Sequence, residues 1–184
     1  VALKRNNYAQ DVQISVRGFG ARSAFGLRGF RLITDGIPAT TPDGQGQAST
    51  VSLTSAEKIE VLTGPLAQLY GNSAGGVIQV FTREADLTPT AQAQIFKGSY
   101  GLERTDWQFS QRVGNVGFVA DYSTFEIQGY RNNSQAKREQ LNSVATIELS
   151  ADTRLKLIAN VFRMPYAKDP IGLTAAQFLA NPKQ

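Results

Sequence analysis

The sequence predicts an α+β domain at the N-terminal side, followed by a run of antiparallel β-strands. Residues 58–82 read as a strand, a short helix, a glycine-rich turn and a second strand, which is a mixed α/β pattern. After Arg83 the sequence changes to long stretches in which apolar and polar residues alternate, as they do in strands with two different faces. The polar stretch Glu84–Pro89 separates these regions. We therefore expect two domains, residues 1–85 and residues 86–184.

The composition argues against an enzyme. The 184 residues include no cysteine and no histidine, which removes disulfides, thiol chemistry and the commonest general base and metal ligand. Asp35 and Asp43 are acidic candidates, but each lies in a sequence typical of a turn. The net charge of +4 is spread along the chain without a basic run, so we expect no nucleic-acid partner.

The sequence also limits the kind of membrane protein. Polar residues or glycine interrupt every apolar run before it reaches the roughly 20 residues that a membrane-spanning helix needs. The start at Val1 lacks the features of a secretory signal, and the last stretch, Leu173–Gln184, is polar. We therefore expect an incomplete chain.

In the N-terminal region, the elements follow from local patterns. Val12, Ile14 and Val16 alternate with polar residues and predict a half-buried strand. The glycine-rich stretch Gly18–Gly29 predicts a loop. A second strand, Phe30–Thr34, runs into Asp35-Gly36, a strong hairpin signal.

The next elements are short. Pro42-Asp43-Gly44 predicts a turn within Ala39–Thr50, and Ser52–Glu57 is expected to begin a short helix capped by Thr54 or Ser55. Ile59, Val61 and the valine-rich stretch after Gly76 suit buried strands. Pro65 is expected to start the helix between these strands, and Gly71 to end it.

Beyond Pro89 five strands are expected, at Thr90–Lys97, Glu103–Val113, Val116–Ile127, Gln140–Ser150 and Arg154–Met164. Several approach the length that a tilted strand needs to cross a bilayer. The connections at Gly114-Asn115 and Ala151–Thr153 are short, whereas those at Gln128–Glu139 and after Pro165 are long and polar. Short turns on one side and long loops on the other favour a transmembrane barrel over a soluble barrel or sandwich.

Several motifs occur together in one order. These are SVRGFG at Ser15–Gly20, DGIP at Asp35–Pro38, and IEV, GP and LYGNSAGGVI within Lys58–Thr82. In this order they resemble the plug domain of TonB-dependent outer-membrane receptors. GARSAFG and PATTPDGQGQ are most similar to siderophore-receptor-like members.

This resemblance implies a mixed α/β plug followed by the first antiparallel strands of a transmembrane β-barrel of about 22 strands. It implies TonB-dependent active uptake of a scarce large ligand, such as a ferric siderophore, another chelate or a cofactor, across the bacterial outer membrane. The partners would be TonB, through an N-terminal segment outside this chain, the extracellular ligand, and outer-membrane lipid. No bound cofactor is implied. Two alternatives remain: a passive or signalling receptor without energised transport, and a soluble β-rich enzyme.

The resemblance also implies where the ligand would bind. Plugs of this family present apical loops to the outside, and the matching segments here are Phe19–Leu27 and Thr40–Gln47. Within them, and in the outer loop that follows, the candidate ligand-binding residues are Arg22, Ser23, Phe25, Asp43, Gln45, Gln47 and Tyr130. An arginine with polar amides suits an anionic ligand, and Phe25 suits a ring.

A further set of residues is expected to support the plug. Gly64, Gly71, Gly75 and Gly76 are expected to allow tight turns and close packing. Arg17 and Glu60 are expected to be half-buried members of a polar network. Plugs of the family commonly carry an arginine just before the Gly-Pro pair, where this sequence has Thr63, so the usual ionic lock to the barrel is in doubt.

Overall fold

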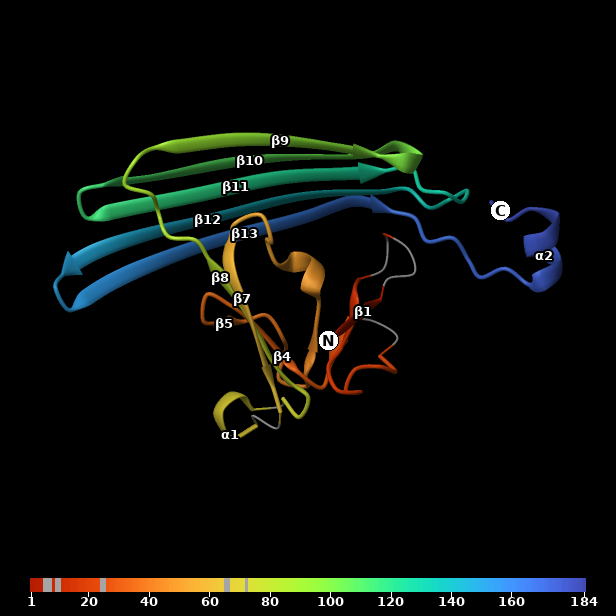
Figure 1. Ribbon diagram of the computed structural model, residues 1–184, viewed down its shortest axis with the longest axis horizontal. Coiled ribbons are helices and arrows are strands. Elements are labelled where there is room, and N and C mark those ends of the chain that lie inside the picture. Colours follow the sequence, from red (N-terminus) through yellow and green to blue (C-terminus); the bar gives the residue numbers. More distant parts are fainter. Residues whose placement is uncertain (5–7, 9–10, 24–25, 65–66, 72) are drawn as a thin grey trace. The chain divides into compact units, whose positions relative to one another are not determined.

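The computed structural model describes residues 1–184 except 5–7, 9–10, 24–25, 65–66 and 72 (Figure 1). Its contacts divide the chain after Glu84 into two compact units, with most of residues 1–84 in the first and residues 85–184 in the second. No helix in the described part of the chain is long and apolar enough to cross a membrane.

The first unit is built from short elements. In chain order they are β1 (Ala2–Lys4), β2 (Gln13–Ser15), β3 (Leu27–Arg28), β4 (Arg31–Thr34), β5 (Ile37–Pro38), β6 (Gln45–Gly46), the 3-10 helix η1 (Ala48–Thr50), β7 (Ala56–Thr63), α1 (Ala67–Tyr70) and β8 (Gly76–Thr82). The main sheet has the strand order β5-β4-β8-β7. Strands β1 and β2 form a separate two-stranded sheet, and so do β3 and β6. Strands β4 and β8 are parallel, and both outer strands of the main sheet are antiparallel to their neighbours.

The core of the first unit comes from alternating apolar residues. Val16, Leu27 and Phe30 are almost completely buried, together with residues of β4 and β8 such as Leu32 and Val80. The predicted burial of β8 is confirmed, because it lies in the middle of the main sheet. The expected burial of Ile59 and Val61 is wrong. Both side chains are exposed, because β7 lies at the edge of the sheet.

The predicted Asp35-Gly36 hairpin is confirmed. Asp35 and Gly36 both have positive φ, 51° and 84°, and they join β4 to β5 with Thr34 opposite Ile37. The Asp35 carboxylate also accepts hydrogen bonds from the backbone N–H of Thr82 (2.9 Å) and from its hydroxyl (2.7 Å). The turn residue therefore also secures the end of β8.

Glycines are needed where β8 begins. A Cβ on Gly75 would lie 2.6 Å from Cβ of Phe19, and a Cβ on Gly76, where φ is 131°, would lie 2.2 Å from the carbonyl oxygen of Leu62. Real Cβ contacts are not this short, so both positions require glycine. Gly64 and Gly71, on either side of α1, have positive φ of 126° and 74°. The predicted helix start at Pro65 lies outside the described residues.

Two further expectations are corrected in this unit. Residues 52–57 do not begin a helix, because the carbonyl of Ser55 accepts a bond from Arg83 N–H (3.0 Å) and β7 starts at Ala56. Arg17 is exposed and has a φ of 54° in a turn, so it is not a half-buried strand residue. Glu60 is half-buried as expected, and its partner is Lys58, at 2.5 Å.

The second unit is one antiparallel sheet in which every strand pairs with its neighbour in the sequence (Figure 1). Its elements are β9 (Thr90–Gly98), η2 (Ser99–Gly101), β10 (Leu102–Val113), β11 (Val116–Ile127), β12 (Ala136–Ser150), β13 (Thr153–Ala167) and α2 (Ala175–Ala180). All five predicted strands are present. Strand β12 begins four residues earlier than expected, so the loop before it is shorter, at residues 128–135.

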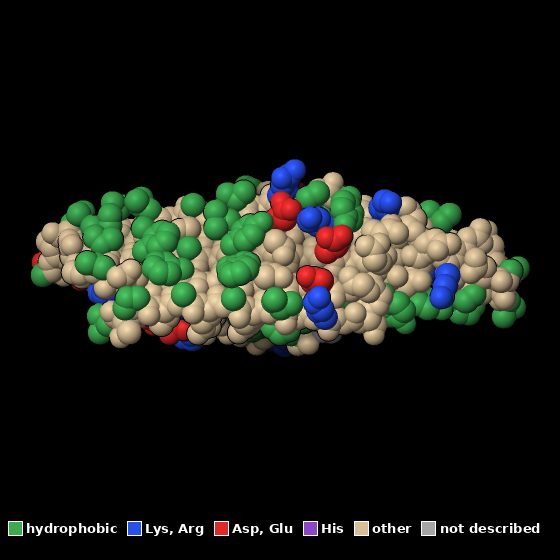
Figure 2. Space-filling view, turned by 90° about the horizontal axis from the view of Figure 1, so that it is seen from above, with side chains coloured by type: hydrophobic (Ala, Val, Ile, Leu, Met, Phe, Trp, Pro, Cys, Tyr) green, Lys and Arg blue, Asp and Glu red, His purple; other side chains and the backbone are tan. Residues whose placement is uncertain are grey.

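The two faces of this sheet differ in character. One face of β10–β12 carries buried polar residues, including Asp106, Ser110, Asp121 and Asn142. The opposite face carries exposed large apolar side chains such as Trp107, which Figure 2 shows as a broad hydrophobic area. This is the alternation of a polar lumen face with a lipid-facing apolar band that is typical of outer-membrane strands.

Candidate functional site

The two loops expected to be apical meet through a short strand pair. Strand β3 pairs with β6, which places Leu27 opposite Gly46 and Arg28 opposite Gln45. The contact is close, because a Cβ on Gly26 would lie 2.3 Å from the carbonyl oxygen of Gly46. The end of the first loop, at Gly26, therefore lies against the strand β6 of the second loop.

Asp11 fastens the second of these loops to the rest of the unit. Its carboxylate accepts hydrogen bonds from the N–H groups of Ala48 (2.9 Å) and Ser49 (3.0 Å), and also from its neighbour Val12 (2.9 Å). The first two are at the start of η1, where N–H groups lack partners within the helix. The Asp11 side chain thus fixes the end of a loop that lies 37 residues away in sequence.

The Pro42-Asp43-Gly44 turn is confirmed, and it is held by side chains. The N–H of Gly44 donates to the carbonyl of Thr41 (2.9 Å), and the N–H of Gln45 donates to the Asp43 carboxylate (3.2 Å). The Thr41 hydroxyl contacts the same carboxylate. That hydroxyl, followed by the Gln45 N–H, holds the pKa of Asp43 below its ordinary value, and the guanidinium of Arg28 acts in the same direction. Asp43 is therefore a fixed negative charge at neutral pH.

A shallow hollow of about 550 Å³ lies over this loop. It is lined by Gly26, Ala39, Thr41, Asp43, Gln45, Gly46, Gln47 and Thr50. The side chains of Asp43, Gln45 and Gln47 are exposed. The hollow thus offers a carboxylate, two primary amides and two hydroxyls, a set able both to donate and to accept hydrogen bonds.

The structure brings together only part of the predicted site. The three candidates of the second loop, Asp43, Gln45 and Gln47, all line the hollow. Arg22 is exposed and Ser23 is half-buried, with its hydroxyl 3.4 Å from the carbonyl oxygen of Gly26, and neither lines the hollow. Phe25 lies outside the described residues.

Tyr130 belongs to the second unit and to a different surface. Its ring meets the ring of Tyr100 edge-on at 5.4 Å, and the ammonium of Lys183 lies 5.7 Å from its centre. The side chain is thus packed within its own unit. As a ligand-binding residue, Tyr130 stays a prediction.

Sequence reasoning missed Arg28 and Asp11. Arg28 stands opposite Gln45 only because β3 pairs with β6, and strands of two residues leave no periodic pattern to detect. Asp11 acts on residues far along the chain, so no local motif marks it.

Comparison with known proteins identifies the first unit. The family model described as TonB-dependent Receptor Plug Domain matches residues 1–77. Residues 1–77 belong to this plug-domain family. The pesticin receptor of Yersinia enterocolitica is 37% identical over 78 residues, which cover 41% of this chain and 11% of that receptor. The ferric enterobactin receptor of Pseudomonas aeruginosa is 32% identical over 85 residues, which cover 40% of this chain and 11% of that receptor.

The match to solved structures extends beyond the plug domain. The pyoverdine outer membrane receptor FpvA of Pseudomonas aeruginosa aligns with a TM-score of 0.61 and 21% identity, covering 74% of this chain and 21% of that receptor. The predicted fold, a plug domain followed by antiparallel strands like the start of a TonB-dependent barrel, is confirmed. The expected outer-membrane location is also confirmed. The family is one of receptors and transporters rather than enzymes. The chain spans about a tenth of the length of the two curated relatives.

Proposed function

We propose that the complete protein takes up a scarce large ligand, a ferric siderophore or a similar chelate or cofactor, by TonB-dependent transport across the bacterial outer membrane. The proposal is supported by the names of the relatives, which include a ferric enterobactin receptor and a pyoverdine receptor. Residues 1–85 would be the plug and residues 86–184 the first part of the barrel. TonB would act through a segment that precedes this chain.

The observation that carries the proposal is the hollow over the second apical loop. Its lining side chains are exposed and polar, while the backbone beneath them is fixed by Asp11 and by the Asp43 turn. A pre-organised polar surface loses little conformational entropy when it binds a ligand. Its amides and hydroxyls suit a ligand that presents many hydrogen-bonding groups, and Arg28 or Arg22 would add a positive charge for an anionic one.

Uptake with and without TonB tests the mechanism. Cells that express the complete receptor would be supplied with radioiron-labelled ferric siderophores of several chemical classes under iron limitation. We expect accumulation of at least one class in cells with TonB and none in cells that lack it. Equal accumulation in both strains would favour a passive receptor, and binding without accumulation would favour a signalling receptor.

A matched pair of variants tests the site. Gln47→Ala removes an exposed amide from the hollow, whereas Gln68→Ala removes an exposed amide from α1, outside it. Loss of one hydrogen bond of about 0.5–1.5 kcal/mol should weaken ligand binding by about two- to tenfold in the first variant only. If the two variants bind the ligand equally well, the hollow is not where the ligand sits.

A further inference from the structure

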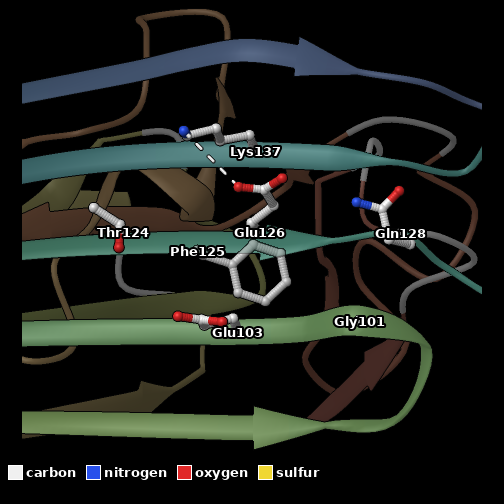
Figure 3. Close-up of a pocket in the computed structure, with 7 residues that line it drawn as sticks. All are labelled: Gly101, Glu103, Thr124, Phe125, Glu126, Gln128 and Lys137. Carbon is white, nitrogen blue, oxygen red and sulfur yellow. Dashed lines mark ion pairs between the residues drawn. The ribbon is translucent and has the colours of Figure 1, made fainter.

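The polar pocket on the sheet of the second unit is lined by charges that already pair with one another (Figure 3). It has a volume of about 420 Å³, and the carboxylate of Glu126 is turned toward Lys137. One oxygen of Glu126 accepts a hydrogen bond from the hydroxyl of Tyr166 (2.7 Å), and the other lies 3.8 Å from the ammonium of Lys137. Glu103 pairs with Lys97 at 3.6 Å. Because a ligand would have to displace these partners, the hollow of the plug is the better binding surface.

The chain enters the plug through a strand that is weakly held. Strand β1 pairs with β2 alone, and Leu3 lies opposite Ile14. Ile14 belongs to the buried core, whereas Leu3 is 68% exposed. The large apolar side chain of β1 is thus left in solvent, so its backbone pairing is what holds β1 to β2. A displacement that arrives from the N-terminal side would act on this pairing first.

The carboxylate of Asp11, two residues before β2, lies against both loops at the hollow. It accepts the N–H groups of Ala48 (2.9 Å) and Ser49 (3.0 Å), which directly follow the lining residue Gln47. A Cβ on Gly26, a lining residue from the first loop, would lie 3.8 Å from Oδ2 of Asp11. One side chain at the entry to β2 therefore supports the hollow from below.

These contacts depend closely on where the Asp11 backbone lies. The N–H of the next residue, Val12, donates to the same oxygen that accepts from Ser49, so the carboxylate is tied to the chain that enters β2. A separation of about 3.6 Å is no longer a hydrogen bond, and aspartate has a short side chain that cannot follow its partners. A shift of the Asp11 backbone by about 1 Å would therefore break the bonds to Ala48 and Ser49.

We propose that Asp11 is a positioning residue that couples the N-terminal end of the plug to the hollow. While β1 is paired with β2, the carboxylate holds the second loop and the hollow keeps its shape. When β1 is drawn away, Asp11 releases Ala48 and Ser49 and the hollow loosens. Linkage requires the reverse with equal strength, so a chelate bound in the hollow makes β1 harder to draw away. The coupling rests on the proposed function, in which a chelate occupies the hollow and TonB acts through the segment before this chain.

Proline substitutions in β1 test the coupling in the complete receptor without any chelate. Leu3→Pro and Lys4→Pro, made together, remove two neighbouring N–H groups, one of which donates across an antiparallel pair. Leu3→Ala with Lys4→Ala keeps both N–H groups and is the matched control. We expect the amides of Ala48 and Ser49 to exchange with deuterium about tenfold faster in the proline variant, the factor for losing one charge-assisted hydrogen bond, and at the wild-type rate in the control.

A double-mutant cycle shows whether Asp11 carries the effect. In the Asp11→Ala background the two prolines should cause no further change at Ala48 and Ser49, because the acceptor is already gone. Rates are taken relative to the amides of β8, so that a general loss of stability does not count as coupling. The proposal is overturned if the prolines leave exchange at Ala48 and Ser49 unchanged, or if they raise it by the same factor with and without Asp11.

The reverse measurement needs no change in β1 and therefore covers a proline variant that fails to assemble. Asp11→Ala alone should speed exchange of the β1 amides by the same factor of about ten, and unchanged β1 exchange would also overturn the coupling. Uptake of radioiron-labelled chelates by wild-type receptor keeps the two proposals apart. If the coupling is found but no chelate accumulates, only the proposed function fails, and if a chelate accumulates without the coupling, only the role of Asp11 fails.

Discussion

Removal of the Asp11 carboxylate should loosen the apical loop without unfolding the plug. Asp11→Ala takes away the acceptor of the Ala48 and Ser49 N–H groups, at 2.9 and 3.0 Å. A hydrogen bond to a charged group contributes about 1.5–3 kcal/mol, so the two bonds together hold the loop closed by on the order of 3 kcal/mol or more. Since 1.4 kcal/mol is a factor of ten, the two amides should exchange with solvent about a hundredfold faster.

Hydrogen–deuterium exchange of the complete receptor measures this directly. Asp11→Asn keeps one acceptor oxygen of the side chain but loses the charge, so its amides should exchange at a rate between wild type and Asp11→Ala. Amides of β8 serve as the internal reference, because this strand is central in its sheet and distant in sequence from Asp11. Unchanged exchange at Ala48 and Ser49 in Asp11→Ala would refute the idea that this carboxylate holds the loop.

Three other outcomes are expected. Gly75→Val should destabilise the receptor by about 1–3 kcal/mol, because the new side chain is overpacked against Phe19, and should therefore lower the amount of folded receptor. Gly172 has open space around it, so Gly172→Val should leave that amount unchanged. Immunoblots of outer membranes compare the two variants. Arg22→Ala should weaken ligand affinity about tenfold at unchanged receptor levels, and unchanged affinity would exclude it from the site. Because the pKa of Asp43 is lowered in the folded loop, its stabilising effect is present above the ordinary value and lost as pH falls through the lowered one. The protection of the Gln45 amide, which is its exchange rate relative to the intrinsic rate at the same pH, should therefore fall in acid in the wild type and stay independent of pH in Asp43→Asn.

Much of the fold could be predicted because its signals are local. The Asp35-Gly36 hairpin needs only two residues with positive φ between apolar runs, and the strands of the second unit show their period over nine or more residues. The predictions were wrong where residues that are distant in sequence but close in space determine the local structure. Ile59 has a side chain typical of buried strands, yet it is exposed because β7 is the edge strand of its sheet. Ser55 does not begin a helix, because its carbonyl accepts a hydrogen bond from the N–H of Arg83, a residue far from it in the sequence.

The candidate site could be predicted only in outline. The polar residues of the second loop were found because the loop follows a turn with a clear mechanism, Pro42-Asp43-Gly44. The position of Arg28 beside Gln45 depends on a strand pair of two residues per strand, and the anchoring of Ala48 by Asp11 depends on a contact across 37 residues. Such pairings are set by the packed core, which a single sequence does not reveal.

The pairing of strands also sets the order in which the chain can fold. In the second unit each strand meets the strand next to it in sequence, and β10 reaches β11 through the turn at residues 114–115. In the first unit β4 must meet β8 across residues 35–75. Closing the longer loop costs about 3 kcal/mol more chain entropy than closing the shorter one. We therefore expect the hairpins of the second unit to form early, and the parallel pair β4–β8 of the plug to form later, because its strands are far apart in the sequence.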